Sequence, residues 1–410
     1  MIGVGIMGYG TVGSGVAEVL SMNAASITQK AGCQIEVKKI LDLRDFPGDP
    51  NEGKLTKDFQ DILKDESIQI VVETMGGLHP AYEFVKQALE ADKNVVTSNK
   101  LLVAEKGDEL LQIAKEHQRN FFFEASVGGG IPILWPLYEC LAANEVTEIA
   151  GILNGTTNFM LNKMIEEKMT FDDALALAQK LGYAERDPSA DIDGHDACRK
   201  ICILAALAFG NHIYPQDVYC EGLRNVTLED VATAAAMDSV IKLIGHAKKC
   251  DDGRVAIGVY PMVLKQQCLL THVSDVFNAV QVKGNAVGDV MFYGPGAGKL
   301  PTASAVVGDV IDAAKHVSMN KSPVWAPAKE GSIVPQENVE SAFVLRFSCD
   351  CDVTPAVHAI FGDVQYVYRE GAPANELAFV TPVLSEKVLQ EKIKQLAGAT
   401  LISSLRFGTL

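Results

Sequence analysis

The first thirteen residues constrain the fold of this chain more than any other stretch. Ile2 to Met7 form an apolar run of strand length, and Gly8-Tyr9-Gly10-Thr11-Val12-Gly13 and a helical pattern follow at once. Strand, GxGxxG and helix in this order are typical of a dinucleotide-binding turn. Gly8 allows the tight turn, Gly10 lets the main chain approach a pyrophosphate, and Gly13 lets helix and strand pack closely. Because the free amides at the helix start would face the phosphates, we expect a bound cofactor rather than a merely glycine-rich turn.

Strands and helices alternate through the first third of the chain. Further strand patterns occur in QIEVKKILDLRD, IQIVVETMGG, NVVTSNK and NFFFEASVGGGIPI. This alternation predicts an α/β fold with a doubly wound parallel sheet of the Rossmann type. Ligands of such sheets bind at the carboxyl ends of the strands. Lys100 follows one such end, in a predicted loop, so we expect it beside the nicotinamide rather than in solvent.

The second strand should end at the adenosine ribose of the cofactor. An acidic residue at this point favours NAD, whereas a nearby arginine favours the 2′-phosphate of NADP. Asp42 and Arg44 both occur here. The sequence therefore predicts NAD or NADP and leaves the preference open.

Composition excludes several other classes of protein. A chain of 410 residues is long enough for two or three domains. The formal net charge of −16 argues against non-specific nucleic-acid binding. No apolar run reaches the roughly 20 residues of a membrane span, and no signal-like start is present. The nine cysteines are scattered, without a CxxC pair, which favours reduced thiols and a cytoplasmic location over a disulfide framework or a zinc site.

Acidic residues crowd in front of a lysine in GYAERDPSADIDGHDACRK, residues 182–200. A helix starting at Asp193 or Gly194 would place Asp196 and Lys200 at i and i+4, on one face. An exposed pair of this kind contributes only about 0.5 kcal/mol. However, Lys200 runs directly into the apolar ICILAALAF, so we expect it at a core margin. Partial desolvation would make it a better proton donor and acceptor near neutral pH.

The same region carries a family resemblance. Ala178, Gly182-Tyr183-Ala184, Asp187-Pro188, Asp191-Ile192, Gly194, Asp196 and Lys200 keep the spacing of the homoserine dehydrogenase signature. NGTTNFML, TSNKLLVAEKGDEL and GPGAGKLPTASAVVGD also look like that family, and the resemblance covers roughly residues 1 to 320. It implies NAD(P)-dependent interconversion of L-homoserine and L-aspartate 4-semialdehyde.

The resemblance also implies roles for individual positions. Lys200 matches the proposed acid/base lysine, and Lys100 matches the lysine beside substrate and nicotinamide. Glu185 and Asp196 match residues that hold the polar groups of homoserine. The cofactor contacts expected from the residues themselves are Gly8, Gly10, Thr11, Val12 and Gly13 of the glycine turn with Asp42, Arg44 and Lys100, and the resemblance adds Gly182 and Gly298. The implied sodium or potassium site, built from one carboxylate and main-chain carbonyls, comprises Glu124, Val127, Gly129 and Ile131.

The chemistry of the reaction agrees with these roles. Hydride transfer to an aldehyde builds negative charge on oxygen, and a positioned ammonium can stabilise and then protonate it. The ammonium of an amino-acid substrate requires carboxylates. We therefore expect some of the acids to bind substrate and Asp196 to hold the lysine. Asp187, Asp191 and Asp193 could equally do no more than cap and solvate the turn.

The segment after the predicted catalytic region returns to the nucleotide fold through two strands, the loop GPGAG and a helix. We expect a nucleotide domain of residues 1–132 plus 298–325 and a catalytic and dimerisation α+β domain of residues 133–297. A linker over 326–340 and an ACT-like domain over 341–410 would complete the chain. The resemblance implies a homodimer or homotetramer.

The last seventy residues read as strand, helix, strand, strand, helix, strand. This βαββαβ order resembles an ACT module, which often binds an amino-acid effector. The Asp-Arg-Pro-Gly turn usual after the first strand is replaced by CDCDVTPAV. A sensor of threonine and a module used only for assembly both remain open.

Two further interpretations compete with the main hypothesis. One is another amino-acid dehydrogenase on the same scaffold, against which the full pattern through Lys200 argues. The other is a non-catalytic regulator, which would need neither Lys100 nor Lys200. No kinase-like segment precedes the dehydrogenase, so we expect no fused aspartokinase. Thr74 replaces the usual aliphatic residue of the family at a position expected to border the nicotinamide.

Overall fold

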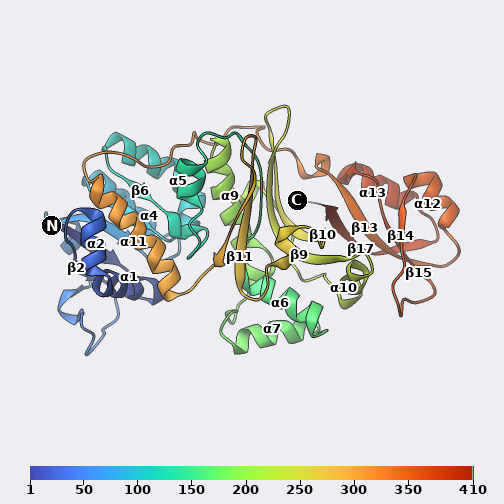
Figure 1. Cartoon of the computed structure of the whole chain (residues 1–410), viewed down its shortest axis with the longest axis horizontal. Coiled ribbons are helices and arrows are strands. Elements are labelled where there is room, and N and C mark those ends of the chain that lie inside the picture. Colours follow the sequence, from blue (N-terminus) through green and yellow to red (C-terminus); the bar gives the residue numbers. More distant parts are fainter. Residues whose placement is uncertain (409) are drawn as a thin grey trace.

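The computed structural model describes residues 1–408 and 410, which contain a parallel and a mixed β-sheet (Figure 1). The parallel sheet has six strands in the order β3-β2-β1-β4-β5-β6, and every strand pair in it is parallel. Its strands are β1 (Ile2–Met7), β2 (Ile35–Leu41), β3 (Leu55–Thr56), β4 (Ile68–Glu73), β5 (Asn94–Thr97) and β6 (Phe121–Phe122). The order reverses between β1 and β4, which confirms the predicted Rossmann type.

Helices cover both faces of the parallel sheet. One face carries α1 (Thr11–Met22), α2 (Ala24–Ala31) and α11 (Lys299–Lys315). The other carries α3 (Gln60–Leu63), α4 (Ala81–Glu90) and α5 (Lys100–Glu116). The orange α11 lies among the blue helices at the left of Figure 1, although most of the chain separates them in sequence.

The start of α5 differs from the prediction. Lys100 was expected in a loop, but it is the first residue of the helix. The cause is Asn99, whose side chain accepts a hydrogen bond from the Leu102 amide and so caps the helix immediately after β5. Lys100 is therefore held on a rigid element at the carboxyl end of the sheet.

The mixed sheet has eleven strands, nine of them in the continuous order β12-β11-β7-β9-β10-β17-β13-β15-β14. Its first part consists of β7 (Val146–Ile152), β8 (Tyr219–Cys220), β9 (Ser239–Lys249), β10 (Val255–Lys265), β11 (Phe277–Gly284) and β12 (Gly288–Pro295). The helices of this part are α6 (Gly155–Glu166), α7 (Phe171–Lys180), α8 (Ser189–Ile192), α9 (His195–Phe209) and α10 (Leu228–Ala235). Of these, α6, α9 and α10 pack on β9.

The C-terminal segment has the predicted strand and helix order with one addition, the two-residue strand β16. Its elements are β13 (Glu340–Cys349), α12 (Thr354–Phe361), β14 (Gln365–Val367), β15 (Glu376–Val380), β16 (Leu384–Ser385), α13 (Glu386–Gln395) and β17 (Ala399–Gly408). The four main strands do not form a sheet of their own, however, because β17 pairs in parallel with β10 through Met262–Leu264. The sheet consequently runs from the catalytic region into the C-terminal segment.

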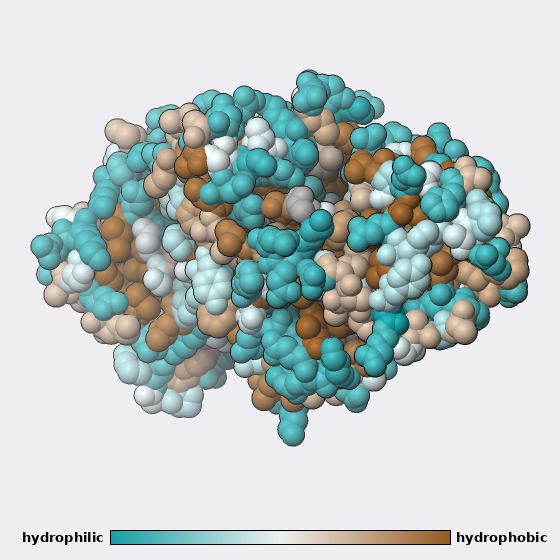
Figure 2. Space-filling model, turned by 45° about the vertical axis from the view of Figure 1, so that its right-hand side comes forward, coloured by the Kyte–Doolittle hydropathy of each residue, from teal (hydrophilic) through white to brown (hydrophobic). Residues whose placement is uncertain are grey.

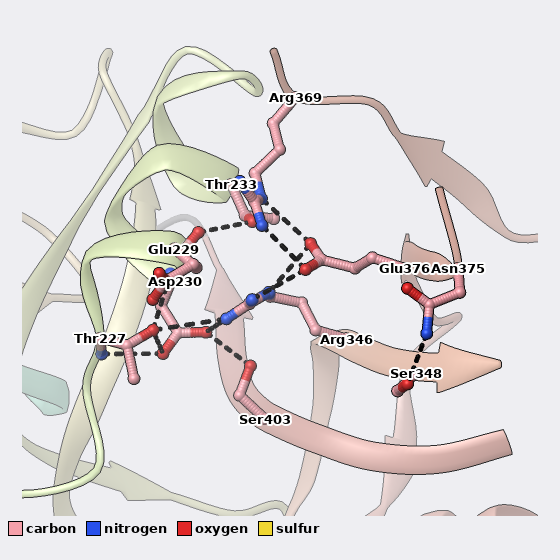
Figure 3. A network of polar contacts seen from close by, with 10 residues as sticks. All are labelled: Thr227, Glu229, Asp230, Thr233, Arg346, Ser348, Arg369, Asn375, Glu376 and Ser403. Carbon is pink, nitrogen blue, oxygen red and sulfur yellow. Dashed lines mark hydrogen bonds and ion pairs between the residues drawn. The ribbon is translucent and has the colours of Figure 1, made fainter. Parts of the chain in front are cut away.

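A buried ion network reinforces this junction (Figure 3). Arg346 of β13 donates to Asp230 of α10 over 2.8 Å and to Glu376 of β15 over 3.1 Å. Its side chain is 4% exposed. Arg369 donates to the same Glu376 carboxylate over 2.8 Å. Two carboxylates and two guanidiniums thus compensate one another where the C-terminal segment meets α10.

The outer surface is mostly polar. Hydrophilic residues predominate on the face shown in Figure 2, and apolar residues there form scattered groups. Within residues 1–408 and 410, no helix combines the length and the apolar character needed to cross a membrane.

Candidate active site

The glycine turn has the tight geometry that the motif predicts. Gly8 follows β1 with a φ of +92°, in the left-handed region that glycine tolerates. A Cβ on Gly13 would lie 1.9 Å from the Gly8 carbonyl oxygen, so helix α1 can pack this closely only with glycine there. A Cβ on Gly10 would meet only Arg44, at 3.8 Å. The main chain at Gly10 is thus open to a ligand.

Thr74 supports this turn. Its hydroxyl donates to the Gly8 carbonyl oxygen over 2.8 Å. The side chain is half-buried at the end of β4. An aliphatic residue at this position would leave the Gly8 carbonyl without this hydrogen bond. Thr74 therefore fixes the glycine turn in place.

Asp42 and Arg44 form a closed pair at the end of β2. The guanidinium donates to both oxygens of Asp42, over 3.0 and 2.9 Å, and the Tyr9 amide donates to Asp42 over 2.7 Å. Hydrogen bonds from Arg44 hold the pKa of Asp42 well below its usual range. The carboxylate is therefore ionised, and Arg44, 63% exposed, covers it on the side of Gly10.

One cleft of about 670 Å³ lies between the two sheets. The domain of the parallel sheet contributes Ser98 after β5 and Val12 in the first turn of α1, and the domain of the mixed sheet contributes the starts of α6, α9 and β11. The predicted residues that line the cleft are Val12, Lys100, Val127, Gly129, Gly182, Glu185, Asp196, Lys200 and Gly298. The predicted residues outside its lining are Gly8, Gly10, Thr11, Gly13, Asp42, Arg44, Glu124 and Ile131.

Asp196 joins the two lysines at the bottom of this cleft. Its Oδ2 atom accepts from Lys200 Nζ over 2.8 Å, and its Oδ1 atom pairs with Lys100 Nζ. Burial favours protonation of Asp196, but the two ammonium groups outweigh it and lower the pKa of this carboxyl. Both oxygens of Asp196 are thus engaged by ammonium groups.

Lys200 is almost fully buried and has a defined orientation. Nζ donates to Asp196 and, over 2.7 Å, to the Leu153 carbonyl oxygen. Burial lowers the pKa of Lys200, the charge of Asp196 opposes this shift, and Lys100 adds to it. Two of the three ammonium hydrogens are engaged, so the third is available to a ligand in the cleft. Lys100 is more open, with a 39% exposed side chain.

Asn154 is a site residue that the sequence analysis missed. It caps α6 by accepting from the Thr157 amide, and its amide group donates to Asp196 over 3.0 Å and to Asp191 over 2.7 Å. Asp191 lines the cleft, and burial raises the pKa of its carboxyl. Asn before a glycine and a helical pattern is a capping signal, but the capping role alone does not indicate contact with two acids.

The other acids of this stretch differ in role. Asp187 accepts from the amide and hydroxyl of Ser189, and Asp193 is paired with Arg224. These contacts fit the capping alternative. Glu185 is exposed at the rim of the cleft, and Gly182 follows α7 with a φ of +78°.

In the loop of the predicted cation site, the carboxylate of Glu124 accepts main-chain hydrogen bonds. Glu124 accepts from the amides of Ile133, Leu134 and Trp135 over 2.6 to 2.9 Å, so its oxygens fix the chain that follows. Among the described residues, none donates a hydrogen bond to the main-chain carbonyls of Val127, Gly129 or Ile131. Free carbonyl oxygens fit a hard monovalent cation, and the Glu124 carboxylate is already engaged by three main-chain amides.

Comparison with known proteins shows which family has a sequence like that of this chain. The models for the homoserine dehydrogenase NAD-binding domain and for homoserine dehydrogenase match residues 8–124 and 132–311. The homoserine dehydrogenase of Bacillus subtilis (strain 168) is 42% identical over 322 residues, which cover 78% of this chain and 74% of the relative. The chain belongs to the homoserine dehydrogenase family.

Solved structures of homoserine dehydrogenases share the fold. The crystal structure of the protein from Thiobacillus denitrificans has a TM-score of 0.91 at 37% identity and covers 100% of this chain and 98% of its own. A hyperthermophilic archaeal homoserine dehydrogenase in complex with NADPH has a TM-score of 0.65 at 31% identity and covers 76% and 97%.

These matches confirm the predicted reaction. A homoserine dehydrogenase is an NAD(P)-dependent oxidoreductase that interconverts L-homoserine and L-aspartate 4-semialdehyde. This activity belongs to the biosynthesis of threonine, methionine and isoleucine. The family assignment also argues against the alternative that this chain is a non-catalytic regulator.

Proposed function

We propose that Lys200 and Lys100 carry the proton chemistry of this reaction and that Asp196 positions both. When bound, NAD(P)H supplies the hydride for the aldehyde carbon. Negative charge then develops on the aldehyde oxygen, where the free N–H of Lys200 can donate. In the direction of homoserine oxidation, neutral Lys200 accepts the hydroxyl proton. The contact that carries this proposal is the bridge from Lys100 through Asp196 to Lys200.

The substrate's ammonium would be held by carboxylates at the cleft wall. We assign this role to Asp191 and Glu185, because both line the cleft and neither is paired with a basic side chain among the described residues. Asp196 would contribute through its negative field, since its oxygens are already engaged by the lysines. Lys100 lies between this group and the nicotinamide end.

The residues of the nucleotide domain fit NAD(P). The pyrophosphate would lie on the amides of the glycine turn, the adenosine ribose at Asp42 and Arg44, and the nicotinamide between Val12, Lys100 and Gly298, with Gly182 at the edge. Both cofactors are accommodated in this proposal. Arg44 would meet the 2′-phosphate of NADP, and Asp42 would accept from the ribose hydroxyls of NAD once Arg44 turns away.

We further propose that a sodium or potassium ion binds the free main-chain carbonyls of Val127, Gly129 and Ile131. Glu124 would contribute through its main chain rather than through its carboxylate. Oxygen ligands are those that hard cations prefer. The ion would fix the loop that forms one wall of the cleft.

The proposed domain organisation follows the packing. Residues 1–132 with 298–325 bind the cofactor, residues 133–297 carry catalysis and dimerisation, residues 326–340 link, and residues 341–410 form an ACT-like unit. In the mixed sheet β12 is an edge strand with exposed Met291 and Tyr293, which supports a homodimer or homotetramer built there. The turn between β13 and α12 has no glycine, so assembly is favoured over effector binding.

One assay tests these proposals together. The oxidation of NADPH and NADH is followed with L-aspartate 4-semialdehyde, with sodium, potassium or neither, and with and without threonine. Turnover that requires either ion supports the cation site, and turnover unaffected by threonine supports the assembly role. Absence of turnover by folded protein with both cofactors would contradict the catalytic assignment.

A further inference from the structure

Asn278 lies in the cleft with an amide that the described residues leave unsatisfied. It is the second residue of β11 and is 2% exposed. Its Oδ1 atom is fully buried and has no hydrogen-bond partner. Nevertheless, Asn278 lines the same cleft as Lys100, Asp196 and Lys200. Buried amides are normally hydrogen-bonded, so an unpaired one beside a catalytic group indicates a partner that comes with the ligand.

Two glycines make room for this amide. A Cβ on Gly296, in the GPGAG loop, would lie 2.1 Å from Asn278 Nδ2. A Cβ on Gly155, the first residue of α6, would lie 3.4 Å from Asn278 Oδ1. The amide is therefore wedged between the loop that leads to Gly298 and the N-terminus of α6. No hydrogen bond fixes its orientation, so rotation about χ2 can turn the amino group toward α6.

The start of α6 has free donors beside Asn278. Of the first four amides of this 12-residue helix, Thr157 donates to the Asn154 side chain and Asn158 to the Asn154 carbonyl. The amides of Gly155 and Thr156 have no partner among the described residues. Together with the partial positive charge of the helix N-terminus, they favour an anion at this point.

We infer that Asn278 determines specificity for an amino-acid substrate by donating from its amide to the substrate's α-carboxylate, together with the Gly155 and Thr156 amides. This rests on the proposed function. Asp191 lies next to the same helix start through its hydrogen bond with Asn154. A carboxylate at the helix start and an ammonium at Asp191 would match the two groups on the α-carbon of homoserine, and would leave its hydroxyl to reach Lys200.

The inference is tested by inhibition with two unreactive analogues, L-2-aminobutyrate and L-2-aminobutyramide. They differ only in the carboxylate. Asn278→Ala should weaken inhibition by the acid about tenfold, the contribution of one hydrogen bond to a charged group, and change inhibition by the amide less than about twofold. Asn278→Asp should weaken inhibition by L-2-aminobutyrate about a hundredfold, because the new side-chain carboxylate repels the carboxylate of the inhibitor. Asn278→Ser, which retains a donor, should lie between wild type and Asn278→Ala.

The alternatives give different results. If Asn278 instead accepted from the ammonium, Asn278→Asp would bind both analogues as well as wild type or better. If the amide only supported the GPGAG loop, all variants would change both inhibition constants equally and raise the KM for NAD(P)H. Either result overturns the inference. Exposed Asn338→Asp, far from the cleft lining, is the matched control. Failure of the wild type to turn over homoserine would contradict the proposed function instead.

Discussion

Lys200 and Asp196 lie one helical turn apart on α9 and are joined by a 2.8 Å ion pair inside the protein, where their side chains are 9% and 6% exposed. An exposed ion pair at this spacing would contribute little to stability, whereas burial shifts the pKa values of both groups. Burial lowers the pKa of Lys200, and two ammonium groups lower the pKa of the Asp196 carboxyl against its own burial. A lysine with a lowered pKa is thereby fixed in the lining of the cleft.

Lys200→Met should abolish most turnover without abolishing cofactor binding. Loss of a positioned general acid and base lowers kcat about 10²- to 10⁴-fold in both directions. The measurement is steady-state kcat together with titration of NADPH fluorescence. Exposed Lys180→Met, at the end of α7, is the matched control and should retain full activity. Wild-type kcat in Lys200→Met would refute the assigned role.

Asp196→Asn should shift the pH dependence of homoserine oxidation. The negative charge of Asp196 favours charged Lys200, so its removal lowers the pKa of Lys200 further. Oxidation requires the neutral amine, and the acid limb of the kcat/KM profile should therefore move to lower pH. We also expect kcat to fall about 100-fold or more because both lysines lose their anchor. A limb that moves to higher pH would contradict this electrostatic account.

The sequence predicted those parts of the molecule that local patterns determine. The strand before Gly8 and the i, i+4 spacing of Asp196 and Lys200 were sufficient for the nucleotide fold and the buried ion pair. Contacts between distant segments were not predictable in this way. Asn154 and Asn278 line the same cleft as Lys200 only because segments distant in sequence fold together, and neither residue type carries a signal for that.

The same limit explains two differences between expectation and structure. The sequence indicates a cation as the partner of the Glu124 carboxylate, which stays a prediction, and the structure adds three amides that the returning chain presents to it. The last strand, β17, was expected within a separate unit, but its free edge pairs with β10. Edge pairing depends on which strands remain open after folding, and no property of β17 alone determines it.

Substitutions at Asp42 and Arg44 should change cofactor preference in opposite directions. Arg44→Ala removes the guanidinium that is paired with Asp42 and should lower kcat/KM for NADPH about tenfold relative to NADH. Asp42→Ala removes the acceptor for the ribose hydroxyls and should favour NADPH by a similar factor. The ratio of kcat/KM for the two cofactors checks both. Lys57→Ala, which breaks the exposed pair with Asp45, should leave the ratio unchanged.

Removal of Arg346 should destabilise the junction with the C-terminal segment. Arg346→Ala leaves Asp230 and Glu376 buried without this cation (Figure 3), which typically costs about 3 kcal/mol or more of the free energy of unfolding. Arg254→Ala breaks an exposed ion pair with Asp252 and should have little effect. Urea unfolding of both variants gives the comparison. Equal stability of the two would mean that the buried network does not hold the junction.

Lys242 should make stability rise with pH above neutrality. It is a 2% exposed lysine of β9 whose Nζ donates to Asn158, Asn162 and the Val273 carbonyl, none of which is charged. Burial lowers the pKa of Lys242 to about 8 from an ordinary 10.5. The folded state therefore favours the neutral amine. Its contribution to stability is complete above pH 10.5 and is lost as the pH falls through 8.

The size of this effect follows from the same two pKa values. Between pH 7.5 and 9.5 the free energy of unfolding of the wild type should rise by about 2 kcal/mol relative to Lys242→Met, which cannot titrate at this position. Lys180→Met, which replaces an exposed lysine at the end of α7, again serves as control. A difference between wild type and Lys242→Met that stays constant with pH would mean that Lys242 remains charged in the core, held by its three neutral acceptors alone.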